Sequence, residues 1–204
     1  MYAPVGSREE LRRLLRRYNE EPDQWAQIAA AIEQRFQRRV AILVLDSSGF
    51  SRTVRSVGIV HFLALLERLE LLVRPCVESC DGRILRAEAD NIFAVFPHPE
   101  RAVRAALAAM RSLRMVNDIL PKEDEIYASI GIGYGPVLLV GDHDVYGDEM
   151  NLACKLGEDL AQREEIVLTA SAWAALDAGE WPFQEQHYSI SGIEIAAYLL
   201  AYTP

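Results

Sequence analysis

The chain has 204 residues and a formal net charge of −9; half of its residues are hydrophobic and a quarter are charged. This is the composition of an ordinary globular domain with one core, and it argues against disordered and fibrous classes. The acidic balance argues against a nucleic-acid partner, which would be bound largely through Lys and Arg. No apolar run approaches the roughly 20 residues of a membrane span, and residues 1–17 lack the apolar core of a signal peptide. We therefore expect a cytoplasmic protein without a membrane partner.

Residues 1–38 predict a helical N-terminal extension made of two helices. Ser7 and Glu10 have the spacing of a capping box at a helix start, and apolar residues follow at helical spacing up to Tyr18. Residues 21–23 interrupt this pattern, after which a second apolar series repeats every three to four residues. The extension could be a dimerisation arm, a regulatory lid or a packing element. We favour packing, which could be against a second chain.

Residues 39–204 predict one α+β domain. Strands are expected at residues 40–45, 83–89, 91–96, 127–132, 137–140 and 165–168, and in a tail at 183–202 that is broken at 191–192. Helices are expected at residues 57–80, 100–115, 147–161 and 170–176. The order strand, helix, two strands, helix and strand is the βαββαβ signature of a ferredoxin-like core. The later strands are additional to that core.

Two acidic residues stand where predicted strands meet turns. Asp46 follows the apolar run at 40–45, and Asp90 lies between the strands at 83–89 and 91–96. Neighbouring central strands would bring the two carboxylates together, and a shared hard cation removes their repulsion. Asp46 alone would be interpreted as the cap of the following helix. The pair favours a site for Mg²⁺, which takes one or two carboxylates together with phosphate oxygens.

Two further segments carry residue types suited to phosphate chemistry. The turn at residues 47–50 leads from a strand into a helix, and the backbone amides of a helix start can hold a triphosphate. Asn151 and Lys155 are four residues apart and share a helix face. A neutral amide beside a cation suits a phosphoryl transition state. The same spacing also occurs in surface pairs on amphipathic helices, so spacing alone leaves both interpretations open.

Four motifs together resemble those of the class III adenylate/guanylate cyclases. They read Val-Leu-Asp-Ser-Ser-Gly-Phe-Ser at 44–51, Arg-Ala-Glu-Ala-Asp-Asn-Ile-Phe-Ala-Val-Phe at 86–96, Gly-Ile-Gly-Tyr-Gly-Pro at 131–136, and Asp-Val-Tyr-Gly-Asp-Glu-Met-Asn-Leu-Ala-Cys-Lys-Leu at 144–156. The motifs stand in the order that the family has. The resemblance runs from about residue 40 to residue 202 and leaves the N-terminal helices outside.

The resemblance implies a metal site and a triphosphate site. Asp46 and Asp90 match the two aspartates that bind metal ions in the family. The loop that holds the triphosphate is matched by the turn of Ser47, Ser48, Gly49 and Phe50. The implied cofactors are two divalent cations, Mg²⁺ or Mn²⁺.

The resemblance also implies residues that act on the ribose, the phosphate and the base. Asn151 matches the asparagine that positions the ribose, and Lys155 stands where the family usually has an arginine that stabilises the pentavalent phosphorus. Arg86 stands where adenylate cyclases usually have a base-reading lysine, and Asp144 matches the aspartate that accepts the adenine amino group. Residues 191–192, Ser-Gly, stand where the family often has a lysine that grips the β and γ phosphates.

The implied reaction is attack of the ribose 3′-oxygen on the α-phosphorus, which releases pyrophosphate by a two-metal mechanism. ATP is the expected substrate, and the expected assembly is a homodimer whose active sites are each built from two chains. One alternative is a cyclase for a pyrimidine triphosphate, CTP or UTP, because Arg86 alters the base pocket. Another is a non-catalytic module that binds a nucleotide or regulates a partner.

Overall fold

A computed structural model describes residues 6–48, 58–177, 179–190 and 193–202. Its strands are β1 (Gln37–Ser48), β2 (Arg83–Glu88), β3 (Asn91–Phe96), β4 (Tyr127–Val140), β5 (Asp144–Tyr146), β6 (Ile166–Thr169), β7 (Phe183–Ile190) and β8 (Ile193–Leu200). Its α-helices are α1 (Arg8–Glu20), α2 (Trp25–Phe36), α4 (Ile59–Glu78), α5 (Pro99–Asn117), α6 (Asp148–Cys154) and α7 (Ala170–Ala174). Short 3₁₀ turns η1 (Pro22–Gln24) and η2 (Lys122–Asp124) and a π-helix η3 (Lys155–Leu160) complete the described elements. Within these residues, no helix is both long enough and apolar enough to cross a bilayer.

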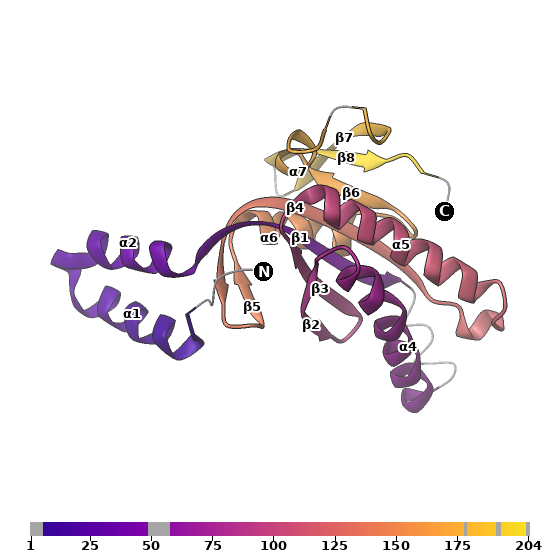
Figure 1. Ribbon diagram of the computed structural model, residues 1–204, viewed down its shortest axis with the longest axis horizontal. Helices are drawn as coiled ribbons and strands as arrows, with labels where there is room; N and C mark the ends of the chain where they lie inside the picture. The colour runs from indigo at the N-terminus through magenta and orange to yellow at the C-terminus, as the bar shows by residue number, and fades with distance from the viewer. Residues whose placement is uncertain (1–5, 49–57, 178, 191–192, 203–204) are drawn as a thin grey trace.

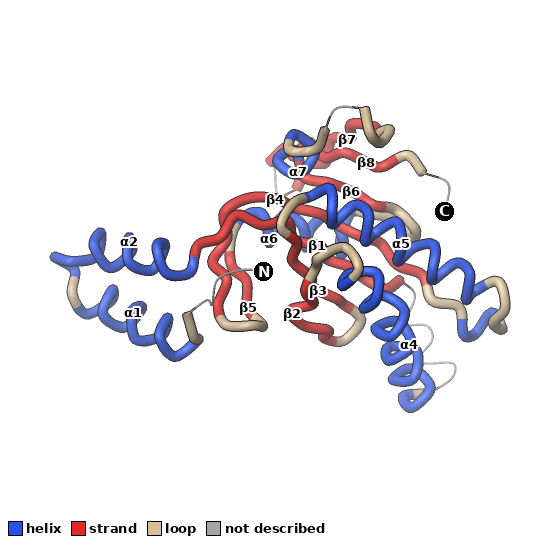
Figure 2. Tube along the Cα trace, in the orientation of Figure 1, coloured by secondary structure: helices blue, strands red, loops and turns tan. Residues whose placement is uncertain are grey.

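The strands form one sheet in the order β2-β3-β1-β4-β6-β8-β7, and β5 pairs with β4 (Figures 1 and 2). β1, α4, β2, β3, α5 and β4 follow one another along the chain, with β1 antiparallel to both β3 and β4. This order confirms the predicted α+β class and its βαββαβ core. The added strands extend the sheet beyond β4, where β6 runs parallel to β4 and β8 and β7 form a hairpin.

The two faces of β1 have different partners because successive side chains of a strand point to opposite sides. Ala41, Leu43 and Leu45 belong to the main core, with residues of α4 and α5. Ile42 and Val44 belong to a second buried cluster that includes residues of α6. Alternation along β1 therefore places the even-numbered residues on the face where α6 lies.

The segment 127–140 is a single strand, so the predicted break at 133–136 is wrong. Gly133 and Gly135 suggested a turn, but both pair with β1 within the ladder. Glycine is needed at 133 because α6 lies directly on β4: a Cβ there would be 2.5 Å from the carbonyl oxygen of Glu149. The glycines of β4 therefore allow a helix to approach closely, in line with the general role of glycine inside strands.

Three other elements differ from the sequence-based expectation. β1 continues to Ser48, so Ser47 and Ser48 lie in the strand and not in a turn. The helix expected at 147–161 is α6 followed by a π-helix, whose Gly157 lies against the backbones of β1 and β4. β5 was not expected, because three residues are too few to show a strand pattern. The tail does form two strands, β7 and β8, as predicted.

The N-terminal extension contains two helices, as predicted; they form a hairpin that projects to one side of the body (Figure 1). Ser7 caps α1 by accepting a hydrogen bond from the backbone N–H of Glu10. The hairpin has its own small core, in which Leu11 and Phe36 are buried together with Val140 at the end of β4. The extension is thus packed on the body through the far end of β4. The boundary between residues 38 and 39 stays a prediction.

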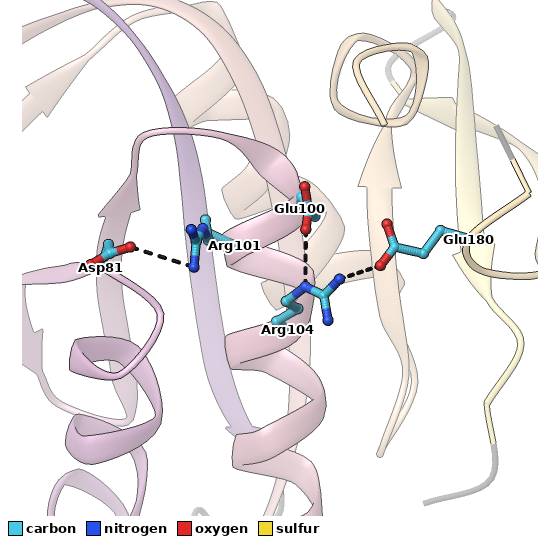
Figure 3. Close-up of polar contacts among 5 residues, drawn as sticks. All are labelled: Asp81, Glu100, Arg101, Arg104 and Glu180. Atoms are coloured by element: carbon cyan, nitrogen blue, oxygen red, sulfur yellow. Dashed lines mark hydrogen bonds and ion pairs between the residues drawn. The ribbon is translucent and has the colours of Figure 1, made fainter. Parts of the chain in front are cut away.

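Arg104 of α5 ties the main helical layer to the segment before β7 (Figure 3). Its guanidinium donates to Glu100 on its own helix and to Glu180, and it lies over the ring of Trp181. One turn earlier on the same helix, Arg101 forms an ion pair with Asp81 in the connection between α4 and β2. These contacts join α5 to both of its neighbours along the sheet.

Candidate functional site

Asp46 and Asp90 come together at the end of β1, as their positions in the sequence predicted. Asp46 is paired in register with Asn91 of β3 and with Ser129 of β4. Asp90 lies in the two-residue turn between β2 and β3. The backbone N–H and the hydroxyl of Ser47 both donate to the carbonyl oxygen of Asp90, each at 3.1 Å. The turn that carries one acid is therefore fastened to the strand that carries the other.

Asp46 has a pKa raised from 3.8 to about 7. Burial of this half-buried carboxyl is the main cause, and the nearby charges of Asp90, Glu158 and Asp159 add to it. Several carboxylates in one place disfavour ionisation of each other, and a divalent cation would reverse that preference. Oxygen donors of this kind are the ligands that Mg²⁺ and Mn²⁺ prefer, so the residues present fit the implied metal ions.

Glu158 and Asp159 were not singled out by sequence reasoning. Both lie in η3, and Glu158 accepts a hydrogen bond from the side-chain amide of Asn91 at 3.4 Å. Burial raises the pKa of Glu158, and the charge of Asp159 raises it further. Burial together with Glu158 also raises the pKa of the Cys154 thiol to about 12. The only feature of the sequence that could have indicated Glu158 and Asp159 is their position three and four residues after Lys155. Within the described residues, no three His, Cys, Asp or Glu side chains are arranged to hold a metal ion by themselves.

The expected triphosphate turn is only partly described. Ser47 is 2% exposed, and its hydroxyl is engaged with Asp90. Ser48 is the last residue of β1. Gly49 and Phe50 lie outside the described residues. So do residues 191–192, which stand where the family often has a phosphate-binding lysine. Ser47 thus fastens the turn of Asp90 to β1, and its hydroxyl has a partner within the protein.

The two expected base-reading residues lie on different strands. Arg86 of β2 stacks over the ring of Phe93 at 4.4 Å and forms a 3.7 Å ion pair with Glu88. Asp144 is the first residue of β5 and forms an ion pair with Arg8 of the N-terminal extension. The turn between β4 and β5 contacts β2, because a ring nitrogen of His143 lies 3.3 Å from the carbonyl oxygen of Leu85. The turn that directly precedes Asp144 is therefore in contact with the strand that carries Arg86.

Asn151 and Lys155 lie at successive turns of the chain, and both are exposed. Asn151 is in the first turn of α6, and Lys155 begins η3. The ammonium of Lys155 donates to Asp159, which raises the pKa of Lys155. Within the described part of the chain, no hydrogen bond or ion pair joins either residue to Asp46 or Asp90. The structure thus brings Asp46 and Asp90 together, and it leaves the side chains of Asn151 and Lys155 exposed on a helix.

Comparisons with known proteins identify relatives in sequence and in structure. No protein-family model matches the chain. The uncharacterized protein Rv1320c of Mycobacterium tuberculosis is 30% identical over 152 residues, which are 71% of this chain and 27% of that protein. The chain spans less than a third of the length of the curated relatives that it matches.

Solved structures extend the comparison. An adenylate/guanylate cyclase/hydrolase from Silicibacter pomeroyi has a TM-score of 0.67 at 24% identity, covering 82% of this chain and 99% of that one. A bacterial light-regulated adenylyl cyclase has a TM-score of 0.71 at 18% identity, covering 94% of this chain and 63% of that one. The second match leaves only 6% of the 204 residues uncovered. This is about 12 residues, fewer than the 13 of α1, so the match includes most of the helical extension.

Both adenylyl and guanylyl cyclases occur among the matching structures. The chain therefore has the fold of the catalytic domains of adenylyl and guanylyl cyclases.

Proposed function

We propose that residues 39–204 are the catalytic domain of a nucleotidyl cyclase. The substrate would be a nucleoside triphosphate, ATP in the first place, and the products a 3′,5′-cyclic nucleotide and pyrophosphate. The observation that carries the proposal is the Asp46–Asp90 pair, fastened through Ser47 within a domain of cyclase fold. Two carboxylates that repel each other inside a fold built around them indicate a cation site.

The metal half of the site consists of Asp46 and Asp90. Their oxygens would hold two divalent cations, which supply Lewis-acid stabilisation of the phosphate oxygens and of the attacking ribose oxygen. Ser47 fastens the turn of Asp90 to β1, which would limit movement of the Asp90 backbone relative to β1 when a cation binds. Glu158 adds negative charge beside Asp46, which favours cation binding as well.

The catalytic half consists of Asn151 and Lys155. An amide on the first turn of α6 can donate to and accept from ribose hydroxyls, which orients the 3′-oxygen. The ammonium of Lys155 would neutralise charge that develops on the phosphate oxygens, as a point charge without the fork of arginine. In the described structure Lys155 is held by Asp159. Its catalytic role therefore requires that contact to open when substrate binds.

Base selection is assigned to Asp144 and Arg86. A carboxylate accepts hydrogen bonds only, so Asp144 would select the 6-amino group of adenine or the 4-amino group of cytosine; guanine carries an oxygen acceptor, O6, at the corresponding position. Arg86 would donate to a ring acceptor of the base. A site built on such bonds rejects analogues that leave its polar groups unpaired, so ATP should be preferred over GTP. Cytidine triphosphate is the runner-up because it also presents an amino group.

The two halves would meet across a homodimer interface. Asn151 and Lys155 are exposed and have no hydrogen bond or ion pair to the metal acids in the described chain. A two-fold axis could place them against the metal acids of a second copy and create two equivalent sites. This arrangement uses outward-facing groups that a single chain leaves apart.

The test is an assay of the purified chain with ATP, GTP, CTP and UTP, each with Mn²⁺ and with Mg²⁺. Pyrophosphate release measures turnover, and mass spectrometry of the product identifies the cyclic nucleotide. We expect cyclic AMP, and no turnover by Asp46→Asn or Asp90→Asn. Asp118→Asn, an exposed acid at the end of α5, is the control and should keep full activity. Absence of pyrophosphate with all four nucleotides, from a chain that binds them, would favour the non-catalytic module.

A further inference from the structure

Arg8 of the N-terminal extension makes a bidentate contact with the carboxylate of Asp144 through its guanidinium. Its Nη2 donates to Oδ1 of Asp144 at 3.1 Å, and its Nε lies 2.9 Å from Oδ2. The two residues are 136 positions apart in the chain. The side chain of Asp144 is 14% exposed, so little solvent competes at that carboxylate. A two-point contact of this kind fixes the plane of a carboxylate as well as its position.

The helix that carries Arg8 is itself held in place. Arg8 is the first residue of α1, directly after the Ser7 cap, so its backbone is fixed by the start of the helix. Leu11, one turn later, is buried in the core of the extension together with Val140. The backbone N–H of Gly141 donates to the carbonyl oxygen of Gly6 at 2.9 Å. Arg8 therefore reaches Asp144 from a docked helix and not from a free terminus.

The other side of the β4–β5 turn is held by β2, the strand of Arg86. Arg83 of β2 forms a 2.6 Å ion pair with Asp142 in that turn, and His143 contacts the carbonyl oxygen of Leu85. The turn thus lies between the extension and β2, and Asp144 follows it immediately. The extension and β2 therefore both contact the segment 141–144.

We propose that Arg8 is a positioning residue for base recognition, so that the N-terminal extension forms part of the nucleotide site. The inference rests on the proposed function, in which Asp144 accepts the amino group of the base. Each oxygen of Asp144 uses one lone pair toward Arg8 and keeps another for the base. Tyr146 and Asp144 raise the pKa of Arg8, so the guanidinium stays charged. Loss of Arg8 would let the carboxylate rotate and relax base selection.

The experiment compares the kcat/KM ratio of ATP to GTP, with Mn²⁺, in the wild type and in four variants. Arg8→Gln should lower the ratio by about two- to fivefold, the range typical of one ion pair near a surface. Arg8→Lys keeps the charge without the fork and should fall between the two. Arg12→Gln, one turn further along α1, is the matched control, because Arg12 is exposed and has no ion pair within the described chain. It should leave the ratio unchanged.

A double variant separates positioning from a general effect on the fold. If Arg8 acts through Asp144, Arg8→Gln should not change the ratio further in an Asp144→Ala background. An unchanged ratio in Arg8→Gln, an equal fall in Arg12→Gln, or an undiminished effect in the double variant would overturn the proposal. A wild type that treats ATP and GTP alike would overturn it too.

Equilibrium binding keeps this inference distinct from the proposed function. If the wild type binds nucleotides but makes no cyclic product, the proposed reaction is wrong. In that case the variants are compared by the ratio of their Kd values for GTP and ATP, measured by equilibrium dialysis with Mn²⁺. If the wild type binds neither nucleotide, both proposals are wrong.

Discussion

One carboxylate oxygen of Glu149 accepts a hydrogen bond from the buried hydroxyl of Thr169 at 2.8 Å. The same oxygen accepts from the backbone N–H of Tyr134 at 2.9 Å. Glu149 lies in the first turn of α6, Tyr134 in β4 and Thr169 at the end of β6. A single side chain thus joins the helix that carries Asn151 to two strands of the sheet.

Glu149→Ala should lower the free energy of unfolding by about 1–3 kcal/mol, because it leaves a buried hydroxyl without its acceptor. Glu149→Gln retains an acceptor oxygen and should cost less. Urea denaturation measures both changes, with Asp148→Asn as the control on the exposed neighbour. If α6 also depends on Glu149 for its placement, kcat should fall more than KM rises in Glu149→Ala. Equal stability of Glu149→Ala and the control would contradict this role.

Substitutions of the β4 glycines should distinguish a backbone clash from a side-chain clash. In Gly133→Ala the new Cβ meets the carbonyl oxygen of Glu149, whereas in Gly135→Ala it meets the Cγ of the same residue at 2.7 Å. Each should destabilise the protein by about 1–3 kcal/mol. Combination with Glu149→Ala should relieve part of the strain at 135 and none at 133. Thermal unfolding of the single and double variants tests this, and equal relief at both positions would count against direct contact of α6 with β4.

The raised pKa of Asp46 predicts how stability depends on pH in metal-free buffer. The folded protein holds the proton of this carboxyl up to about pH 7, whereas the unfolded chain releases it near 3.8. The contribution is therefore complete below about pH 4 and is lost as the pH rises through about 7. Allowing for the half-exposed position, the loss should be about 1–2 kcal/mol.

Asp46→Asn should remove this loss, and Asp90→Asn should reduce it by removing a neighbouring charge. Urea denaturation from pH 4 to 8 in EDTA measures the effect. Addition of Mn²⁺ at pH 8 should stabilise the wild type and leave Asp46→Asn nearly unaffected, because cation binding to the folded state adds to its stability. A wild-type profile that matches that of Asp46→Asn throughout would show that Asp46 titrates normally.

Mixing of two inactive variants tests whether each site is shared between chains. Asp46→Ala removes a proposed metal ligand, and Asn151→Ala removes the proposed ribose contact, so under the proposal each homodimer should be inactive. In a mixed dimer, one site carries both changes and the other carries neither. Random exchange of subunits makes about half of the dimers mixed, each with one good site, which gives roughly a quarter of wild-type activity. Both variants must first be shown to fold and to exchange; a mixture that then stays inactive would place the whole site within one chain.

The sequence was sufficient for the βαββαβ core because its apolar runs and breaks are long and regular. Asp46 and Asp90 could be paired on the same basis, since neighbouring strands bring their ends together. The sequence-based prediction failed at a glycine, because glycine occurs both between strands and inside a strand that a helix approaches closely. Gly133 was interpreted as a turn residue, but it makes room for the backbone of α6. That distinction depends on a helix that packs from elsewhere in the chain, which local patterns do not reveal.

Contacts between distant segments were also beyond sequence reasoning. The ion pair of Arg8 with Asp144 joins two residues that no local spacing relates. Glu158 could not be singled out from the sequence, because an acidic residue on an exposed helix is common. Its place in the candidate site follows from its hydrogen bond with Asn91 and from its effect on the pKa of Asp46. The hydroxyl of Ser47 bonds to the neighbouring turn, a contact that the sequence did not indicate. The assignment of the turn at 47–50 to a triphosphate stays a prediction.

The alternation of β1 makes the register of this strand decide which face of the sheet Asp46 occupies. Asp46 faces the side of α6 only because it is an even step from Ile42 and Val44. Deletion of one residue between 40 and 45 would turn Asp46 toward the apolar layer of α4 and α5, where an unpaired carboxylate is costly. The contacts from Ser47 to Asp90 exist in one register alone. A chain that pairs its strands out of register could therefore keep its sheet while it loses the Asp46–Asp90 pair. If this pair binds a cation as proposed, cation affinity would report on the correct register.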